Sequence, residues 1–166
     1  KSGLLFNKNI SVHTLVNIKS TKKDEIFNAA KLELRVLNGK INFDNSIFIN
    51  NNIGLVEVSN SDLFLENDKL ILTANLSIDI KDTDRLFSFL NTSKKSRKNI
   101  NNINNIKLNI VYDFFSNQIQ LKNIKINNNE VSKQFQNIAE GFIDINSNNL
   151  NNSRRLLNKL INFYEG

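Results

Sequence analysis

Hydrophobic and polar residues alternate along much of this chain, and they do so most regularly over Lys69–Ile80. In this stretch six apolar side chains occupy every second position, namely Leu70, Leu72, Ala74, Leu76, Ile78 and Ile80. Successive side chains of a β-strand point to opposite faces, so the pattern predicts a strand with one apolar and one polar face. A helix would scatter the six residues around its circumference. At about 3.3 Å per residue the strand would be roughly 35–40 Å long.

Similar alternation predicts further strands on both sides of this one. Shorter strands are expected at residues 10–18, 30–37, 41–43, 47–49, 53–58 and 63–65, and a second long strand at 106–114. A return strand starts at Ile119, and its apolar residues change parity near Lys122-Asn123, which predicts a β-bulge. A last short strand is expected at 142–145.

Short polar segments separate the predicted strands. Asn38-Gly39 is the strongest hairpin signal in the chain, because both residues accept the positive φ angles of a tight turn. Asp44-Asn45 predicts a kink, and polar turns are expected at 50–52, 59–62, 67–68 and 116–117. Long helical segments do not separate the strands, so they are expected to form an antiparallel meander rather than parallel βαβ units.

Three segments carry a helical period instead. Residues 82–90 cluster apolar side chains on one side, and Asp82 or Thr83 is placed to cap the helix. Residues 131–139 carry apolar residues at i, i+4 and i+7, and residues 152–164 form an amphipathic pattern. The predicted fold is therefore mainly β with a few short helices (α+β), built on a long curved antiparallel meander sheet that forms a groove.

Composition excludes several classes of site. The chain has no Cys, which excludes disulfides and thiolate sites, and its single His excludes a multi-histidine metal site. Phosphate-loop, serine-hydrolase and zinc-protease motifs are missing from the sequence. We therefore expect no catalytic residue, no cofactor and no metal. Residues 1–166 are expected to form one β-rich domain. Because the sequence contains no Met, this domain is expected to come from a longer or processed protein.

The basic residues of one loop have a functional and a plain structural interpretation. The chain has a net charge of +6, and four of its basic residues gather as Lys94, Lys95, Arg97 and Lys98. A solvated connector is the favoured interpretation, ahead of contact with lipid headgroups or a membrane surface. Nucleic acid is not expected as a partner, because the Phe residues occupy core-like strand and helix positions rather than forming a stacking surface.

Two further polar features are best explained structurally. Asp79, Asp82 and Asp84 lie close together but lack the spacing of a calcium-binding loop. A strand end followed by a helix cap accounts for them. His13 falls on the polar side of the first strand, so it is expected at the surface.

The apolar face of the sheet is the remaining candidate site. Its candidate residues lie on the two long strands: Leu70, Leu72, Leu76, Ile78, Ile80, Leu108, Ile110, Tyr112 and Phe114. The plain interpretation is an ordinary core, in which this face meets another sheet or the helices. The functional interpretation is a curved sheet whose concave face holds acyl chains. The pattern alone favours the core.

Several segments resemble a known family in their order and spacing. They are Ile-Asp-Ile-Lys-Asp-Thr-Asp-Arg-Leu-Phe-Ser-Phe at 78–89, the basic loop at 94–98, 103–114 ending in Tyr-Asp-Phe, Ile-Lys-Ile at 124–126 and Arg-Arg-Leu-Leu-Asn at 154–158. Together they resemble the C-terminal region of AsmA-like proteins of alphaproteobacteria, which are related to TamB-like and YhdP-like envelope proteins. The main departure is Asn-rich turns where relatives more often carry Gly or Pro.

The resemblance implies a function that the pattern alone does not give. It implies a periplasmic protein attached to the inner membrane through an anchor helix outside this chain. It also implies a β-groove along which phospholipid tails move between the inner and outer membranes, in outer-membrane biogenesis, without catalysis or a cofactor. Phospholipid is the implied partner, together with an envelope or membrane protein at one end.

Two alternatives stay open at this point. A closed, lipocalin-like carrier would also hold lipid, but it predicts up-and-down strands that close on one another. A structural or protein-interaction β domain would have a dry core and a basic surface. Bound phospholipid would favour the groove or the carrier over the third class.

Overall fold

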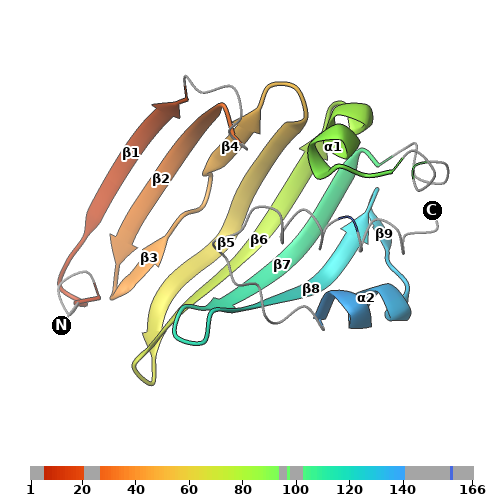
Figure 1. Ribbon diagram of the computed structural model, residues 1–166. Coiled ribbons are helices and arrows are strands. Elements are labelled where there is room, and N and C mark those ends of the chain that lie inside the picture. The colour runs from red at the N-terminus through yellow and green to blue at the C-terminus, as the bar shows by residue number, and fades with distance from the viewer. Residues whose placement is uncertain (1–5, 21–26, 94–96, 98–102, 141–157, 159–166) are drawn as a thin grey trace.

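The computed structural model describes residues 6–20, 27–93, 97, 103–140 and 158 of the chain (Figure 1). These residues form an antiparallel sheet of nine strands and two short helices, so the fold is mainly β as predicted. In chain order the elements are β1 (Val12–Lys19), β2 (Ala29–Leu37), β3 (Lys40–Asn42), β4 (Ile47–Asn50), β5 (Gly54–Glu66), β6 (Lys69–Ile80), α1 (Thr83–Leu90), β7 (Asn105–Asp113), β8 (Gln118–Ile126), β9 (Asn129–Glu130) and α2 (Lys133–Glu140). The short β3 and β4 lie in succession between β2 and β5.

β6 is the central long strand that its alternation predicts, and its bounds agree with the prediction. It pairs with β5 on one side and with β7 on the other, each antiparallel. From β5 to β9 and from β1 to β3, strands that follow one another in the chain are also neighbours in the sheet, as in a meander, whereas β3 and β4 do not pair with each other.

Asparagine supplies most of the turn geometry. Ten non-glycine residues in the described chain have positive φ, and all are Asn or Asp: Asn38, Asn45, Asn60, Asn67, Asp68, Asn91, Asn117, Asn123, Asn127 and Asn128. Short polar side chains tolerate this left-handed region better than other residues. The Asn38-Gly39 hairpin is confirmed, since these residues have φ of 52° and 75° and join Leu37 to its partner Lys40.

Two predicted turns are wrong in detail. Residues 59–62 do not reverse the chain, because β5 continues through them with a bulge at Asn60 and Ser61 opposite Ala74. The turn after β7 has four residues rather than two, since Asp113 pairs with Gln118 across it. By contrast the bulge predicted near Lys122-Asn123 is confirmed as a register shift between β7 and β8.

Both described helices begin at a polar cap. The carboxylate of Asp82 accepts a hydrogen bond from the Arg85 amide at 2.9 Å, which caps α1 as predicted. α2 begins at Lys133, two residues later than the predicted 131, because the Ser132 hydroxyl accepts from the Phe135 amide at 3.2 Å. Val131 instead directs its amide to the Ile124 carbonyl at 3.4 Å, so it continues from the sheet.

Some predictions fall on residues that the structure does not describe. They are the strand at 142–145, the helix at 152–164 apart from Asn158, and the basic loop apart from Arg97. Asn158 is anchored on the C-terminal end of α1, where its amide group hydrogen-bonds to the Leu90 carbonyl and the Thr92 hydroxyl. The two-residue strand β9 was not predicted.

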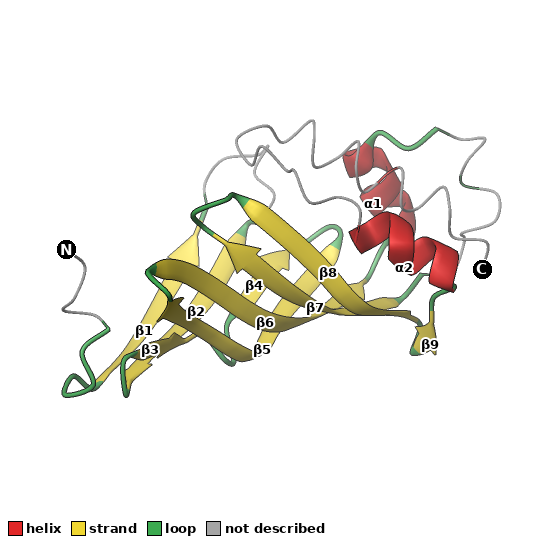
Figure 2. Cartoon of the chain, turned by 90° about the horizontal axis from the view of Figure 1, so that it is seen from below, coloured by secondary structure: helices red, strands yellow, loops and turns green. Residues whose placement is uncertain are grey.

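The main buried cluster lies at one end of the sheet. It joins β6 and β8 to α1, α2 and the segment before β7, through Ile80, Phe87, Leu90, Ile103, Ile124, Ile126, Phe135 and Ala139. Figure 2 shows both helices on the same side of the sheet, and the buried cluster joins them to β6 and β8. The helices therefore cover only part of the apolar face, and neither lies over β1, β2 or β3.

Candidate functional site

The strand registers bring apolar side chains into two rows that cross the whole sheet. The helix-end row runs through seven successive Cα partners: Ile18, Ala30, Phe48, Val56, Ile78, Ile106 and Ile126. The turn-end row also has seven: Val12, Val36, Ile41, Leu63, Leu72, Tyr112 and Ile119. Directly paired residues share a face, so both rows lie on one side of the sheet. At about 4.8 Å between strands, each row is about 30 Å long.

The predicted groove residues fall into two groups on this face. Ile78, Ile80 and Leu108 belong to the helix-covered end, where Ile80 is only 8% exposed and the other two pack against the buried cluster. Five others are half-buried beyond that cluster: Leu70, Leu72, Leu76, Ile110 and Tyr112. The plain core interpretation therefore holds at the helix-covered end. In the turn-end row, Val36 and Ile41 are also buried, at 2% and 5% exposed, so the accessible part of the face is the half-buried stretch on β6 and β7.

Phe114 lies just outside the strand to which it was assigned. Its amide donates to the Leu70 carbonyl at 3.0 Å, which keeps it beside β6, and its ring meets Tyr112 edge to face. The side chain is 43% exposed, so Phe114 forms part of the turn-end border of the face.

Two hollows follow the helix-end row. The first, about 310 Å³, is lined by Ile18, Ala30 and Phe48 among others. The second, about 180 Å³, lies between Val56 and Ile78 of the sheet and Phe89 of α1. Phe27 lines both and contacts Phe48 with ring centroids 5.3 Å apart. Apolar side chains make up most of the lining of both hollows, although Ser20 and Asn28 also line the first.

Sequence reasoning missed Phe27 and Phe48 as site residues. Phe48 was placed on a short strand without a function, and Phe27 precedes β2 outside any predicted element. Only the pairing of Ala30 with Phe48 and of Phe48 with Val56 shows that these residues continue the row. That pairing depends on which strands become neighbours.

The opposite face of the sheet is more polar, although Phe64 and Ile71 pair on it. Asn75 and Asn109 are Cα partners on β6 and β7 and hydrogen-bond through their side chains. Asn105 donates to the carboxylate of Asp79 at 2.5 Å and to the hydroxyl of Ser77 at 3.2 Å. The sheet is therefore amphipathic through its thickness, as the alternation of β6 predicts.

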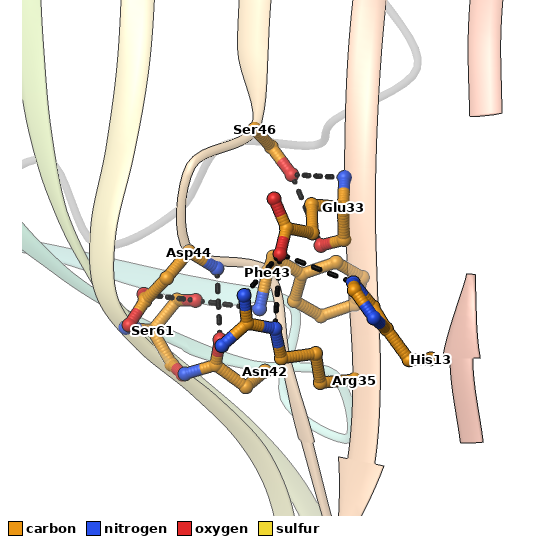
Figure 3. A network of polar contacts seen from close by, with 8 residues as sticks. All are labelled: His13, Glu33, Arg35, Asn42, Phe43, Asp44, Ser46 and Ser61. Atoms are coloured by element: carbon orange, nitrogen blue, oxygen red, sulfur yellow. Dashed lines mark hydrogen bonds and ion pairs between the residues drawn. The ribbon is translucent and has the colours of Figure 1, made fainter. Parts of the chain in front are cut away.

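A polar cluster fastens β2 to the strands on either side (Figure 3). The Glu33 carboxylate accepts from Arg35 Nε at 2.9 Å and lies 3.1 Å from His13 Nε2 on β1. The Ser46 hydroxyl accepts from the Glu33 amide at 3.0 Å. His13 is on the surface as predicted, with its side chain 54% exposed.

A second part of the same cluster holds the β5 bulge. Asp44 accepts from both the amide and the hydroxyl of Ser61, at 2.7 and 2.8 Å, and the Ser61 hydroxyl accepts from the Phe43 amide at 2.7 Å. Asn42 donates to the Ser61 carbonyl at 2.7 Å. Ser61 is fully buried, so these contacts replace the water it would otherwise need. The cluster is occupied by its own contacts, which indicates a structural role.

The pKa shifts of Glu33 and Asp44 support a structural role for the polar cluster. The Arg35 guanidinium beside Glu33 holds the pKa of this carboxyl below its ordinary value. Burial raises the pKa of Asp44, but the hydrogen bonds from Ser61 and other groups outweigh it, so the pKa is lowered overall. Both carboxyls therefore stay ionised at neutral pH, which does not suit a general acid.

The remaining sequence candidates are explained by local structure. Arg97 donates to the Thr92 carbonyl at 3.0 and 2.9 Å and lies over the Phe87 ring, so it holds the end of α1. Asp79 and Asp82 serve as a hydrogen-bond acceptor and a helix cap. Among the described residues no group of three or more acidic or His side chains is placed to bind a metal. The described helices are too short and polar to cross a bilayer.

Comparison of the chain with protein-family models, with curated proteins and with solved structures gives no match. The functional interpretation therefore depends on the residues and their arrangement.

Proposed function

We propose that this chain is a non-enzymatic lipid-binding segment of an envelope protein, which takes phospholipid acyl chains on its apolar β-face. The observation that carries the proposal is the pair of apolar rows crossing seven strands, with two hollows along the helix-end row. The resemblance to AsmA-like proteins supports the same function. On this basis the lipid moves between inner and outer membranes during outer-membrane biogenesis, and the segment lies in the periplasm.

The physical chemistry of the face suits hydrocarbon. Apart from the Tyr112 hydroxyl, the two rows present only apolar side-chain atoms, so an acyl chain meets few groups that require a hydrogen bond. Each methylene removed from water contributes about 0.8 kcal/mol. Contacts of this kind are not directional, so a chain can slide along a row without breaking a specific bond.

The open edges of the sheet favour a groove over a closed carrier. In the described part of the chain β1 pairs only with β2, and β9 pairs only with β8. The sheet therefore does not close on itself, as a lipocalin-like barrel would. The helices cover the β6–β8 end, so the face continues toward β1.

The length of the face limits its role. Rows about 30 Å long hold one lipid but do not bridge two membranes. We therefore place this segment within a longer conduit, whose further strands would pair with the edge of β1 and whose inner-membrane anchor lies outside this chain. An envelope or membrane protein would receive lipid at one end.

Lipid binding can be tested with two variants on adjacent residues. Ile110→Asp places a carboxylate on the apolar face, whereas Val111→Asp places one on the polar face of the same strand, and both positions are half-buried. Native mass spectrometry of the full chain, expressed with lipid present, should show bound phospholipid for the unmodified protein and for Val111→Asp. Ile110→Asp should fold, by circular dichroism, and carry less.

Two results would count against the proposal. Equal amounts of bound lipid on the two variants would show that binding does not depend on the apolar face. A complete absence of lipid from the unmodified chain would favour a structural or protein-interaction domain with a dry core and a basic surface.

A further inference from the structure

The turn end of the sheet carries an exposed apolar tip. The tip consists of Leu65 at the end of β5 and of Phe114 and Phe115 in the turn between β7 and β8. Their exposed fractions are 44%, 43% and 78%, and Phe115 is the most exposed large hydrophobic residue that the structure describes. Leu65 is the Cα partner of Leu70, whose carbonyl accepts from Phe114, so the three residues lie on neighbouring strands. Exposed apolar groups gathered in this way mark a contact surface.

Three backbone amides of this turn already have hydrogen-bond acceptors, beginning with Phe114, which donates to Leu70. The Asp113 carboxylate accepts from the amides of Phe115 and Ser116 at 2.8 and 3.2 Å. The Tyr112 hydroxyl donates to the Asn117 side chain at 3.1 Å. Because these three amides have partners, moving them out of water costs less than moving unpaired amides. The two Phe rings are thus presented on a turn that tolerates an apolar environment.

The charges near the tip are mixed rather than basic. Lys69 Nζ lies 3.9 Å from the Asp113 carboxylate, and Lys40 Nζ lies 2.9 Å from Asp62. Glu66 precedes the adjacent β5–β6 turn, and Asp68 lies within it. A partner chosen by charge would need a patch of one sign, so the tip favours a partner that is recognised through its hydrocarbon.

The position of the tip indicates what kind of partner it contacts. Tyr112 belongs to the turn-end row, and its ring contacts Phe114 with centroids 4.6 Å apart. An unbroken apolar path therefore runs from the tip onto the proposed lipid-binding face. Aromatic side chains at the border of an apolar surface are favoured where membrane and water meet.

We propose that Leu65, Phe114 and Phe115 dock this segment on the surface of a phospholipid bilayer, at the border over which acyl chains pass to the turn-end row. The inference rests on the proposed function, since it takes the bilayer as the source or destination of the lipid. Docking is driven by the apolar side chains, so it does not require anionic lipid and is not weakened by salt.

Tryptophan can report docking, because the full chain contains no Trp. Phe115→Trp keeps the tip apolar, and Leu15→Trp on β1 is a matched control at a side chain that is 56% exposed. With vesicles of phosphatidylcholine and phosphatidylethanolamine, Phe115→Trp emission should shift to the blue and be quenched by lipids brominated in the acyl chain. Leu15→Trp emission should be unaffected, and salt should not reverse the Phe115→Trp shift.

A second pair of variants measures the contribution of the ring. Phe115→Ser should lower vesicle partitioning of the full chain by about tenfold, while Leu15→Ser should leave it unchanged. Equal emission changes at positions 115 and 15, or equal partitioning of the two Ser variants, would overturn the inference. Copurifying lipid in native mass spectrometry is a separate measurement. If it persists while docking is absent, the membrane tip is wrong and the lipid-binding face stands.

Discussion

Placing a carboxylate at two points of the same apolar face should give very different losses of stability. Ile80 lies in the helix-covered cluster and is 8% exposed. Ile80→Asp removes a packed side chain, at about 2–5 kcal/mol, and leaves a charge among Phe87 and Leu90 for several kcal/mol more. Against a typical total stability of about 5–15 kcal/mol, this variant should be largely unfolded.

Leu72→Asp should instead leave the fold intact. Leu72 is half-buried on the turn-end row, so its replacement loses only part of the burial energy of a leucine, about 1 kcal/mol, and the carboxylate reaches water. Urea unfolding followed by circular dichroism measures both variants, with the denaturant slope as a check that the same structure unfolds. If Leu72→Asp unfolds the chain as completely as Ile80→Asp, the turn-end row is a sealed core and our division of the face fails.

Three further predictions concern local structure. Asp82→Ala removes the cap of α1 and should lower the unfolding free energy by about 0.5–2 kcal/mol, measured by urea titration, whereas Asp82→Asn should retain most of it. Hydrogen bonds hold the pKa of Asp44 below its ordinary 3.8, so its stabilising contribution is complete above that pH and is lost as pH falls through the folded value. Asp44→Asn should therefore make the unfolding free energy less steep against pH in this acidic range, and an unchanged slope would contradict the assignment. Gly39→Ala puts a Cβ 2.7 Å from the Phe6 carbonyl oxygen at a φ of 75°, so its thermal midpoint should fall, and an unchanged midpoint would argue against this turn.

The regular parts of this fold are readable from the sequence because their causes are local. The alternation of β6 fixes both its ends and its apolar face. The Asn38-Gly39 pair specifies a hairpin, and the parity change near Asn123 marks the bulge in β8. In each case a few neighbouring residues determine the geometry.

The sequence-based predictions are wrong where residues far apart in the chain determine the local structure. Residues 59–62 have the composition of a turn, yet Ser61 is buried and bound by Asp44, 17 residues away. No local pattern contains that contact. Val131 has helical spacing to Phe135, but the Ser132 cap starts the helix later.

The sequence predicts which side chains share the apolar face, but it does not predict which part of that face the helices cover. The pattern places Leu72 and Ile80 on the same side of β6, but it does not show that the helices pack against Ile80 and not against Leu72. It also does not join Phe48 to Val56, because strand neighbours depend on the whole topology.

The strand registers show that two bulges lie on either side of a bulge-free pair of strands. The β6–β7 ladder runs without a shift, while β5 carries its extra residues at Asn60 and Ser61 and β8 carries its own near Asn123. A bulge bends its strand and increases the local twist, so the bulge-free pair of β6 and β7 is flanked by two strands that bend locally. Asn60 and Asn123, both left-handed, thus mark the two places where the sheet bends. Substitutions in the two apolar rows can therefore change that surface while the bulges that bend the sheet stay in place.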